Sequence, residues 1–549
     1  MRNNSSKQYI THSKPLYVKY NLVSRYLTLI SFGILLLCPN AIAQESEHRV
    51  LWEETPIFTN LAEAQKQKNA VYRLHLQGLN EVPAELSRFK HLRELRLTNG
   101  KITALPTFIG KFQHLELLDL EGNALTTLPE NLAQLTALRE LNVANNQLAQ
   151  LPANMDAWKK LEKLNIRYNK FVTTDIVKAL PTVKEWRLLG NPIPDLTLND
   201  LDLAEAPAVD IATALKNPAL AYKVSFHGVK EIPEELKQLP NLQALVLNNT
   251  FLGTLPTWIG DLGKLQAIQA LNAQLSSLPA EIGKLANLKQ LDLGLNQLTA
   301  LPESLGALKV LKNLQLQGNR LASLPESLGS LPNLEKLGLS NNALKNLPES
   351  LGNLVNLKDL NLLGNGLAKL PASLGKLPNL ENLNIMRNAL QSLPNEITGL
   401  IKLKNLDLRE NILNALPEGL GNMKGLENLQ LRKNLLTALP ESIGGLENLK
   451  GLDLWGNTLK ELPASLGKLT KLENLNLWGN KLDFLPASLG NLTNLKSLDL
   501  WGNALKAIPD SIGNLANLEN LNLNFNALPA LEKDRLKGVL NNTKTIFKF

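Results

Sequence analysis

The sequence predicts a repeat solenoid. The stretch Leu449 to Asn457 reads L-x-x-L-x-L-x-x-N, and it returns at Leu472 to Asn480 and at Leu495 to Asn503, a period of 23 residues. A fixed period of this size indicates stacked supersecondary units. Hydrophobic residues make up 44% of the chain and aromatic residues only 5%. We therefore expect similar layers of leucine, and not a mixed globular core, to fill the interior.

The N-terminal segment predicts export. Residues 1–43 hold five Lys or Arg and no Asp or Glu. The apolar run from Leu27 to Leu37 is shorter than the roughly 20 residues of a membrane span, and Ala41-Ile42-Ala43 follows it. This order is typical of a signal peptide cleaved before Gln44, with an uncleaved anchor as the alternative. We expect a secreted, periplasmic or cell-surface protein with no stable membrane span after cleavage.

The charge and the cysteine content exclude several classes of function. The formal net charge of +8 falls to +3 (8 − 5) without the five cations of residues 1–43. A basic surface for nucleic acid is therefore not expected. The single cysteine, Cys38, lies in the same segment. The mature chain would then have no disulfide cap, thiolate metal site or cysteine nucleophile.

The first part of the mature chain reads as one capped array. Residues 44–56 are a predicted linker, 59–69 a helix and 72–76 a strand. A Leu-Pro or Val-Pro step follows at regular intervals, at Pro83, Pro106, Pro129 and Pro152. The pattern then breaks into a predicted helix at 173–180 and a closing strand at 183–189. We place the first array at 57–191, followed by an acidic, Pro-containing linker at 192–208.

The pattern then restarts from its beginning. Residues 209–226 align without a gap to residues 59–76 at an offset of 150, so the opening helix occurs twice. An array needs such an element to cover its exposed end. We predict a second capped array at 209–549; a single solenoid with an inserted helical layer is the alternative. Its Pro marker runs from Pro233 to Pro509 in steps of 23, which gives 13 repeats. A charged helix at 531–540 and a following strand would form a cap at 529–549.

The unit L-x-x-L-x-L-x-x-N-x-L-x-x-L-P-x-x-L-G-x-L-x-x resembles the leucine-rich repeat, in the form common in bacterial proteins. The resemblance covers nearly all of 70–528. It implies an α/β repeat solenoid shaped like a horseshoe, with a parallel β-sheet on its concave side and usually a binding role. Alternation along Leu452-Asp453-Leu454-Trp455 points the leucines inward and the other two side chains outward. The motif's asparagine is expected to satisfy backbone groups at the turn. The chain has no phosphate-binding G-x-x-x-x-G-K-[ST] motif.

The outward columns of the second array contain the predicted binding site. Stacked strands lie about 4.8 Å apart, so residues one period apart become neighbours. Exposed aromatic residues in a row usually mark a contact surface, and Trp and Arg are favoured in binding hot spots. The alternative is that the indoles pack on each other without a ligand. The predicted binding residues are Met386, Arg409, Arg432, Trp455, Trp478 and Trp501 of one column, with Asp453, Asn476 and Asp499 of the next.

The sequence holds no recognisable catalytic set. His91 and His114 lie one period apart without an evident third ligand, so no metal site is expected. No nucleophile–base pair stands out, and we expect no cofactor. The leading hypothesis is a non-catalytic binding protein whose partner is a protein or peptide, with a glycan as the alternative ligand. The rival functions are a cell-surface adhesion or structural role and, less favoured, a glycan-acting enzyme.

Overall fold

The computed structural model describes residues 52–193, 196–540 and 546–548. Residues 57–549 form one compact unit, separate from residues 1–56. The predicted signal peptide and most of the predicted linker at 44–56 lie outside the described residues. Within the described ranges, no helix combines the length and the apolar composition that crossing a bilayer requires.

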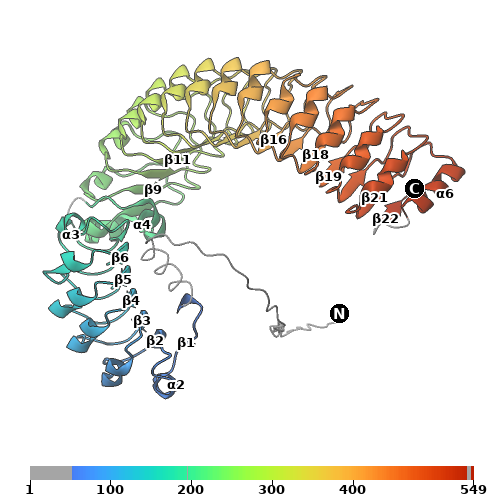
Figure 1. Cartoon of the computed structure of the whole chain (residues 1–549). Coiled ribbons are helices and arrows are strands. Elements are labelled where there is room, and N and C mark those ends of the chain that lie inside the picture. Colours follow the sequence, from blue (N-terminus) through green and yellow to red (C-terminus); the bar gives the residue numbers. More distant parts are fainter. Residues whose placement is uncertain (1–51, 194–195, 541–545, 549) are drawn as a thin grey trace, which may run out of the picture. The chain divides into compact units, whose positions relative to one another are not determined.

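The predicted repeat solenoid is confirmed, and it is built on two parallel sheets (Figure 1). The first sheet has seven strands in chain order: β1 (Ile57–Phe58), β2 (Arg73–Gln77), β3 (Glu94–Thr98), β4 (Leu117–Asp119), β5 (Glu140–Asn142), β6 (Lys163–Asn165) and β7 (Glu185–Arg187). The second has 15: β8 (Lys223–Ser225), β9 (Ala244–Val246), β10 (Ala267–Gln269), β11 (Gln290–Asp292), β12 (Asn313–Gln315), β13 (Lys336–Gly338), β14 (Asp359–Asn361), β15 (Asn382–Asn384), β16 (Asn405–Asp407), β17 (Asn428–Gln430), β18 (Gly451–Asp453), β19 (Asn474–Asn476), β20 (Ser497–Asp499), β21 (Asn520–Asn522) and β22 (Ile546–Lys548).

Neighbouring strands pair in a constant register. Leu429 of β17 lies opposite Leu452 of β18, which lies opposite Leu475 of β19, and each step is one period of 23 residues. Equivalent positions of successive repeats therefore form straight columns across the sheet, as the sequence predicts. The strands lie on the inner side of the curve and short helices on the outer side (Figure 1).

The outer side consists of 3₁₀ helices. In nearly every repeat a proline occupies the N-cap, because its fixed φ suits an extended residue at the start of a turn and its missing N–H is not needed there. The 13 helices η6 to η18 match the 13 predicted repeats. The helices are η1 (Ala84–Arg88), η2 (Thr107–Lys111), η3 (Glu130–Gln134), η4 (Met155–Ala157), η5 (Pro218–Leu220), η6 (Glu234–Gln238), η7 (Thr257–Asp261), η8 (Ala280–Lys284), η9 (Glu303–Ala307), η10 (Glu326–Ser330), η11 (Glu349–Asn353), η12 (Ala372–Lys376), η13 (Asn395–Gly399), η14 (Leu420–Asn422), η15 (Glu441–Gly445), η16 (Ala464–Lys468), η17 (Ala487–Asn491) and η18 (Asp510–Asn514).

Within the described residues, five α-helices flank or interrupt the repeats. The opening helix does occur twice, as α2 (Leu61–Lys66) and α5 (Ile211–Lys216), at an offset of 150, with side-chain caps from Asn60 and Asp210. Helix α3 (Asp175–Ala179) precedes β7, and α6 (Ala530–Val539) precedes β22, so both predicted closing pairs of helix and strand are present. Helix α4 (Asp200–Glu205) was not predicted. The domain boundaries themselves stay a prediction.

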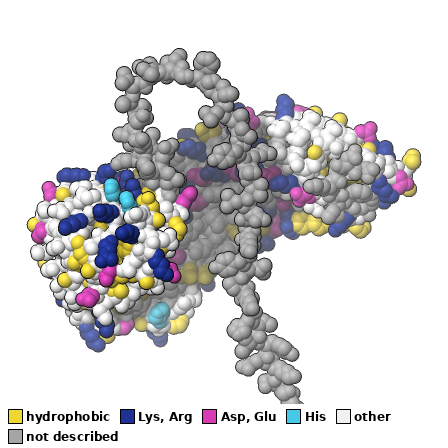
Figure 2. Space-filling model, turned by 60° about the horizontal axis from the view of Figure 1, so that its bottom comes forward, with side chains coloured by type: hydrophobic (Ala, Val, Ile, Leu, Met, Phe, Trp, Pro, Cys, Tyr) yellow, Lys and Arg dark blue, Asp and Glu magenta, His cyan; other side chains and the backbone are white. Residues whose placement is uncertain are grey.

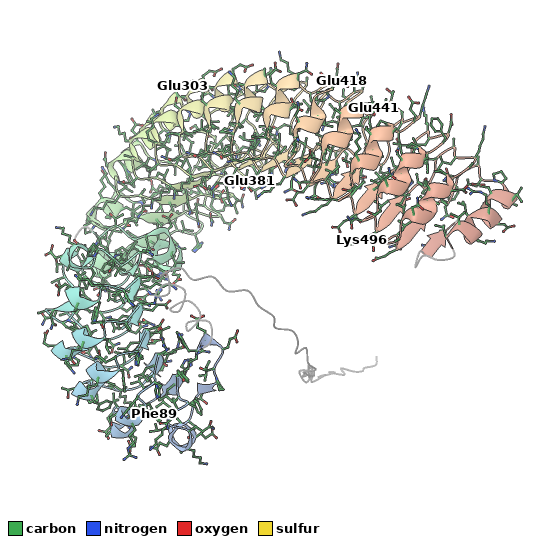
Figure 3. The ribbon with its side chains drawn as sticks, viewed as in Figure 1. Phe89, Glu303, Glu381, Glu418, Glu441 and Lys496 are labelled. Atoms are coloured by element: carbon green, nitrogen blue, oxygen red, sulfur yellow. The ribbon has the colours of Figure 1, made fainter. Side chains whose placement is uncertain are left out.

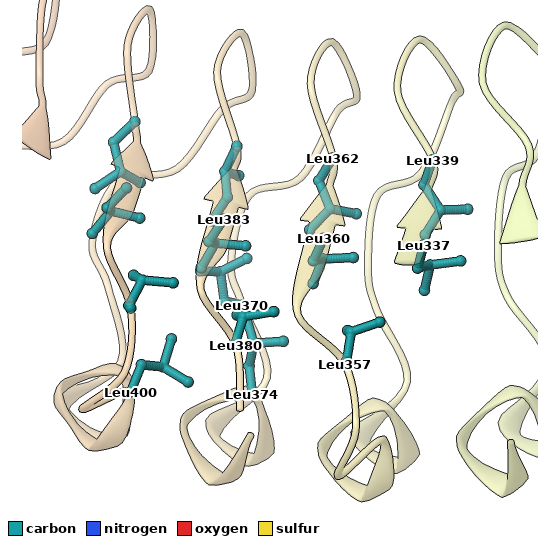
Figure 4. Close-up of a cluster of buried hydrophobic side chains, with 14 of the residues drawn as sticks. Leu337, Leu339, Leu357, Leu360, Leu362, Leu370, Leu374, Leu380, Leu383 and Leu400 are labelled. Atoms are coloured by element: carbon teal, nitrogen blue, oxygen red, sulfur yellow. The ribbon is translucent and has the colours of Figure 1, made fainter. Parts of the chain in front are cut away.

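The core is a set of leucine columns between the strands and the 3₁₀ helices. Strand leucines such as Leu360 and Leu362 share one buried cluster with Leu374 of η12 (Figure 4). These side chains are at most 2% exposed. Truncating one such leucine to alanine in a packed core costs about 2–5 kcal/mol. Since each layer contacts only the adjacent layers, the columns continue for as long as the motif does.

The motif's asparagine completes each layer. Asn457 Nδ2 donates hydrogen bonds to the carbonyls of Leu431 (3.0 Å) and Leu454 (2.9 Å), and its Oδ1 accepts one from the backbone N–H of Leu436 (3.1 Å). The side chain is 5% exposed. Without these bonds three buried backbone groups would lose their partners, at about 1–3 kcal/mol each. The predicted structural role of this asparagine is confirmed.

Residues 196–206, which we call the strap, contact both sheets. The Asp202 carboxylate, 1% exposed, accepts hydrogen bonds from the Arg187 guanidinium and the Leu188 backbone N–H at the end of the first sheet. On the second sheet, Gln243 donates to the Leu196 carbonyl and accepts from the Leu198 N–H, both at 2.7 Å. The segment that composition marks as a linker therefore includes a helix held at both ends.

The strap also covers part of the second sheet. Ala244 and Ala267, the first residues of β9 and β10, are 4% and 8% exposed and share one hydrophobic cluster with Leu198 and Leu203 of the strap. The corresponding residues of β11 and β12 are exposed or half-buried. The strap thus covers part of the concave face of the second array over β9 and β10.

Candidate binding site on the concave face

The predicted binding residues lie on β15–β20 or within two residues of the ends of these strands. They share the solvent-facing, concave face of the second sheet. Each is half-buried. They form two neighbouring columns, because their strands pair one period apart. Strands β16, β18 and β19 are labelled on the inner side of the curve in Figure 1.

Three tryptophans stack across β18 to β20. The ring centroids of Trp455 and Trp478 are 4.5 Å apart at an interplanar angle of 14°. Trp478 and Trp501 are 4.9 Å apart and nearly perpendicular, at 76°. Contacts of this kind add about 0.5–1.5 kcal/mol per pair beyond area burial. The structure thus brings the three predicted indoles into one continuous surface.

The stack extends to a fourth ring that sequence reasoning missed. Phe525 lies 4.8 Å from Trp501, is 76% exposed and has a left-handed backbone (φ 57°). It belongs to the neighbouring column of the repeat, where Gly456, Gly479 and Gly502 precede it. The signal in the sequence was a large aromatic residue directly after three glycines of that column. We call Trp455, Trp478, Trp501 and Phe525 the aromatic ladder.

Self-stacking leaves mainly the edges of the first two indoles free. The Arg432 guanidinium lies 3.6 Å from the Trp455 ring centroid, on the side opposite Trp478. Trp478 is likewise covered by Trp455 on one side and meets Trp501 on the other. Flat sugar rings stack on open aromatic faces, and these faces are occupied. The geometry therefore favours ligands that contact ring edges.

The two predicted arginines have different surroundings. Arg409 makes bonds of 2.6–3.1 Å with both carboxylate oxygens of Asp407, and this raises the pKa of Arg409. Arg432 has no ion pair or side-chain hydrogen bond with any residue in the described ranges, and its Nε is buried without a partner. Of the two arginines, only Arg432 therefore keeps its terminal N–H donors without an acceptor among the described residues.

The predicted polar column is occupied by local structure. Asp453, Asn476 and Asp499 each accept a hydrogen bond from the backbone N–H two residues on, at 3.0–3.1 Å. The donors are the backbone N–H groups of the three tryptophans, so these bonds fix the tryptophan backbone just after each strand. Burial raises the pKa of the Asp453 carboxyl, although the Trp455 N–H and the charges of Arg432 and Arg409 oppose the shift. We assign these residues a positioning role.

An amide-lined groove adjoins the ladder over β14–β17. The side chains of Asn405 and Asn428 each donate to the asparagine one strand earlier, at 2.7 and 2.8 Å, and this chain of amides ends at Gly451, which has no side chain. The groove has a volume of about 430 Å³. Its lining residues are Asp359, Leu360, Asn361, Asn382, Leu383, Asn384, Asn405, Leu406, Asp407, Asn428 and Gln430. We call it the amide groove.

The column of alternating Lys and Glu forms the expected cross-strand pairs. Lys404 pairs with Glu381 and Lys496 with Glu473, each at 2.7 Å. Glu381 and Lys496 lie on the strand side of the ribbon, and Glu303, Glu418 and Glu441 on the helix side (Figure 3). These pairs are exposed, so they contribute little to stability. Figure 2 shows basic and acidic side chains both distributed over the face in view.

No group of three or more His, Cys, Asp or Glu side chains within the described residues is arranged to hold a metal ion. His91 contacts the ring of Tyr72, with centroids 6.1 Å apart. The chemistry of the concave face is therefore that of hydrogen-bonding amides, one unpaired guanidinium and a row of aromatic rings.

Solved structures similar to this chain include a bacterial protein and a plant receptor. A leucine-rich repeat protein of Leptospira interrogans is 30% identical, with 90% of this chain and 100% of that chain covered and a TM-score of 0.48. A plant peptide hormone receptor, RGFR1, solved in complex with RGF2, is 25% identical, with 90% and 89% covered and a TM-score of 0.52. None of the curated protein sequences compared matches the chain.

Family models identify the repeats directly. The model described as a leucine-rich repeat region matches residues 74–204, 341–434 and 428–547. A second model, described as a leucine rich repeat, matches residues 309–367. The first model alone covers more than half of the 549 residues. With its confirmed register and asparagine columns, the chain belongs to the leucine-rich repeat family.

Proposed function

We propose that this protein is an exported, non-catalytic binding protein that recognises a protein or peptide partner through the concave face of its second array. The observation that carries the proposal is the aromatic ladder, which ends in Phe525 at 76% exposure. Soluble proteins seldom leave such a row of rings at the surface without a contact to make. Trp is also among the residues that contribute most to binding energy at interfaces.

Two further observations support a protein or peptide ligand. The first two indoles offer edges and not open faces, which disfavours the stacking that glycan recognition uses. The amide groove beside them is long, open and rich in paired donors and acceptors, which suits a polypeptide backbone. The similar plant receptor was solved in complex with RGF2. Leucine-rich repeat proteins are typically non-catalytic binding scaffolds, and we extend that role to this chain.

Removing the three indoles together tests the proposal. A random-peptide display library is selected on the full mature chain, and the selected peptides are titrated against Trp455→Ala/Trp478→Ala/Trp501→Ala. We expect binding to weaken at least about a hundredfold, because hot-spot truncations cost 2 kcal/mol or more each. Circular dichroism should show an intact solenoid, since the three side chains lie outside the leucine core.

The matched control is Phe484→Ala. Phe484 is 54% exposed and lies in the loop between β19 and η17, within the same repeats but off the sheet face. The Phe484→Ala variant should bind the selected peptides with the affinity of the unaltered chain. Equal binding by the triple variant, or failure of the chain to select any peptide, would contradict the proposed function.

A further inference from the structure

The charges around the head of the aromatic ladder are almost all paired within the chain. Asp407 is held by Arg409. Glu410 pairs with Arg387 at 2.8 Å and with Lys433 at 3.8 Å. These pairings leave Arg432 as the cation of its column without a carboxylate within 4.0 Å among the described residues.

Stacking holds the Arg432 guanidinium in place without using its donors. Its face lies 3.6 Å from the Trp455 centroid. The N–H groups of a guanidinium lie in its plane, so a ring against its face leaves the in-plane donors free. Its Nε, enclosed and without an acceptor, is the kind of buried polar atom that folded proteins rarely leave unsatisfied. Because Nε is enclosed, an incoming acceptor would meet the terminal amino groups of the guanidinium.

The neighbouring polar atoms define the approach to Arg432. Strand β17 contributes Asn428 and Gln430 to the concave face, and Arg432 follows two residues after the strand ends. These three side chains lie at the border between the amide groove and the ladder. The chain of amides ends at Asn428, whose Oδ1 would lie 2.9 Å from a Cβ at Gly451. A segment entering from the groove therefore meets an amide acceptor, then the guanidinium, and then the aromatic rings.

We propose that Arg432 binds a carboxylate side chain of the partner, and that the ladder binds an apolar residue next to it. The partner segment is thus an acidic peptide with a flanking aromatic or aliphatic residue. A carboxylate matches the planar fork of a guanidinium with two parallel hydrogen bonds. This inference rests on the proposed function and specifies the partner chemistry at the same site.

The test uses the peptides selected on the full chain. It changes Arg432 in the protein and the acidic residue in the peptide, separately and together. Peptides that bind should carry Asp or Glu beside an apolar residue more often than the starting library does. Arg432→Gln should weaken binding roughly ten- to a hundredfold, the range expected for a hydrogen bond to a charged group. Replacing the peptide's acidic residue by its amide should cause a similar loss, with little further loss in the Arg432→Gln variant.

Controls separate this inference from the proposed function. Arg320→Gln removes an exposed arginine outside the concave columns and should leave binding unchanged. If the Trp variant loses binding while Arg432→Gln binds as before, or if the selected peptides lack acidic residues, the carboxylate assignment is overturned and the proposed function stands. Tighter binding of a peptide with phosphoserine in place of the acidic residue, without loss in Arg432→Gln, would also overturn it.

Discussion

Two residues of the motif at Leu449–Asn457 have different physical origins. Asn457 is 5% exposed, and its side chain forms hydrogen bonds with backbone groups of two adjacent layers. Folding alone accounts for it. Trp455 is half-buried, contacts Arg432 and Trp478, and contributes nothing to the leucine core. The proposed function therefore depends on residues that the repeat itself does not require.

The column before the asparagine has a left-handed backbone in nearly every repeat of the second array. Glycine adopts this conformation without cost, which explains Gly456, Gly479 and Gly502 (φ 65–69°). Leu295 and Phe525 have the same backbone at φ 55° and 57° and expose 55% and 76% of their side chains. A non-glycine residue there costs about 1–2 kcal/mol. Because the repeat imposes this backbone on Arg387, Glu410 and Lys433 as well, the exposure of the Phe525 ring, and not its conformation, distinguishes this position.

Phe525→Gly should separate stability from binding. The change relieves the backbone strain but removes the contact with Trp501, so the free energy of unfolding should change by less than about 1 kcal/mol. Binding of the selected peptides should nevertheless weaken, because the exposed end of the ladder is gone. Urea unfolding and peptide titration measure the two effects.

The control for this change lies in the same column. Leu295→Gly relieves the same backbone strain ten repeats away from Phe525, since (525 − 295)/23 = 10. It should leave binding as it was. A Phe525→Gly variant with unaltered affinity would remove Phe525 from the site and leave only the three indoles.

At the scale of elements, the outer side of each repeat is too short for an α-helix of ordinary length. Most of its helices span five residues, from the proline cap to a residue just before the next inward leucine. A 3₁₀ helix rises about 2.0 Å per residue against 1.5 Å in an α-helix, so it covers more distance with few residues. The sequence predicts the turn at L-P-x-x-L-G but not the type of helix.

Helix α4 shows how one element changes the available surface. Its N-cap, Asn199, accepts from the Asp202 N–H at 2.7 Å, and its apolar side packs on the second sheet. Asp200 pairs with Lys289 at 2.6 Å, and although burial would raise the pKa of its carboxyl, the lysines lower it. The signal in the sequence was the replacement of Lys and Glu by Gln243 and Gln266 in the column beneath the strap.

Gln243→Leu should release the strap. The change keeps the volume but leaves the Leu196 carbonyl and the Leu198 N–H without partners in a buried place, at about 1–3 kcal/mol each. Amide hydrogen exchange over 196–206 should rise at least about tenfold, because local opening becomes easier. Mass spectrometry of peptic fragments measures it.

The comparison variant is Gln290→Leu, at an exposed position of β11 beside the strap. Exchange over 196–206 should not change in it. Should the Gln243 variant also retain its protection there, the strap would be held by its apolar contacts and by Asp202 instead.

At the scale of the whole molecule, the two concave faces have different chemistry. In the first array, Glu94 is 3% exposed and contacts Arg73, His75 and Arg96. Burial would raise the pKa of Glu94, but the hydrogen bonds from these three side chains outweigh it and lower the pKa. That face satisfies its own charges. The face of the second array beyond β10 combines amides, one unpaired guanidinium and aromatic rings, and we therefore place the partner there.

Export is the remaining whole-molecule prediction. The basic segment, apolar run and Ala41-Ile42-Ala43 predict cleavage before Gln44. The protein recovered from outside the cytoplasm of its own host should begin at Gln44, as N-terminal sequencing would show. A protein that retains residues 1–43 in the membrane would favour the uncleaved anchor.

The sequence by itself determined the repeat, its register, the inward leucines, the structural asparagines and the capping helices at both ends of the second array. It did so because each depends on contacts one period apart, which a fixed spacing makes visible. It also placed the tryptophans in one column. Only the tertiary structure decided that the indoles cover each other's faces, that Phe525 continues the ladder from another column, that Arg409 is paired while Arg432 is not, and that the strap covers β9 and β10. These depend on side-chain conformation and on contacts between different columns, and a repeat pattern carries no information about either.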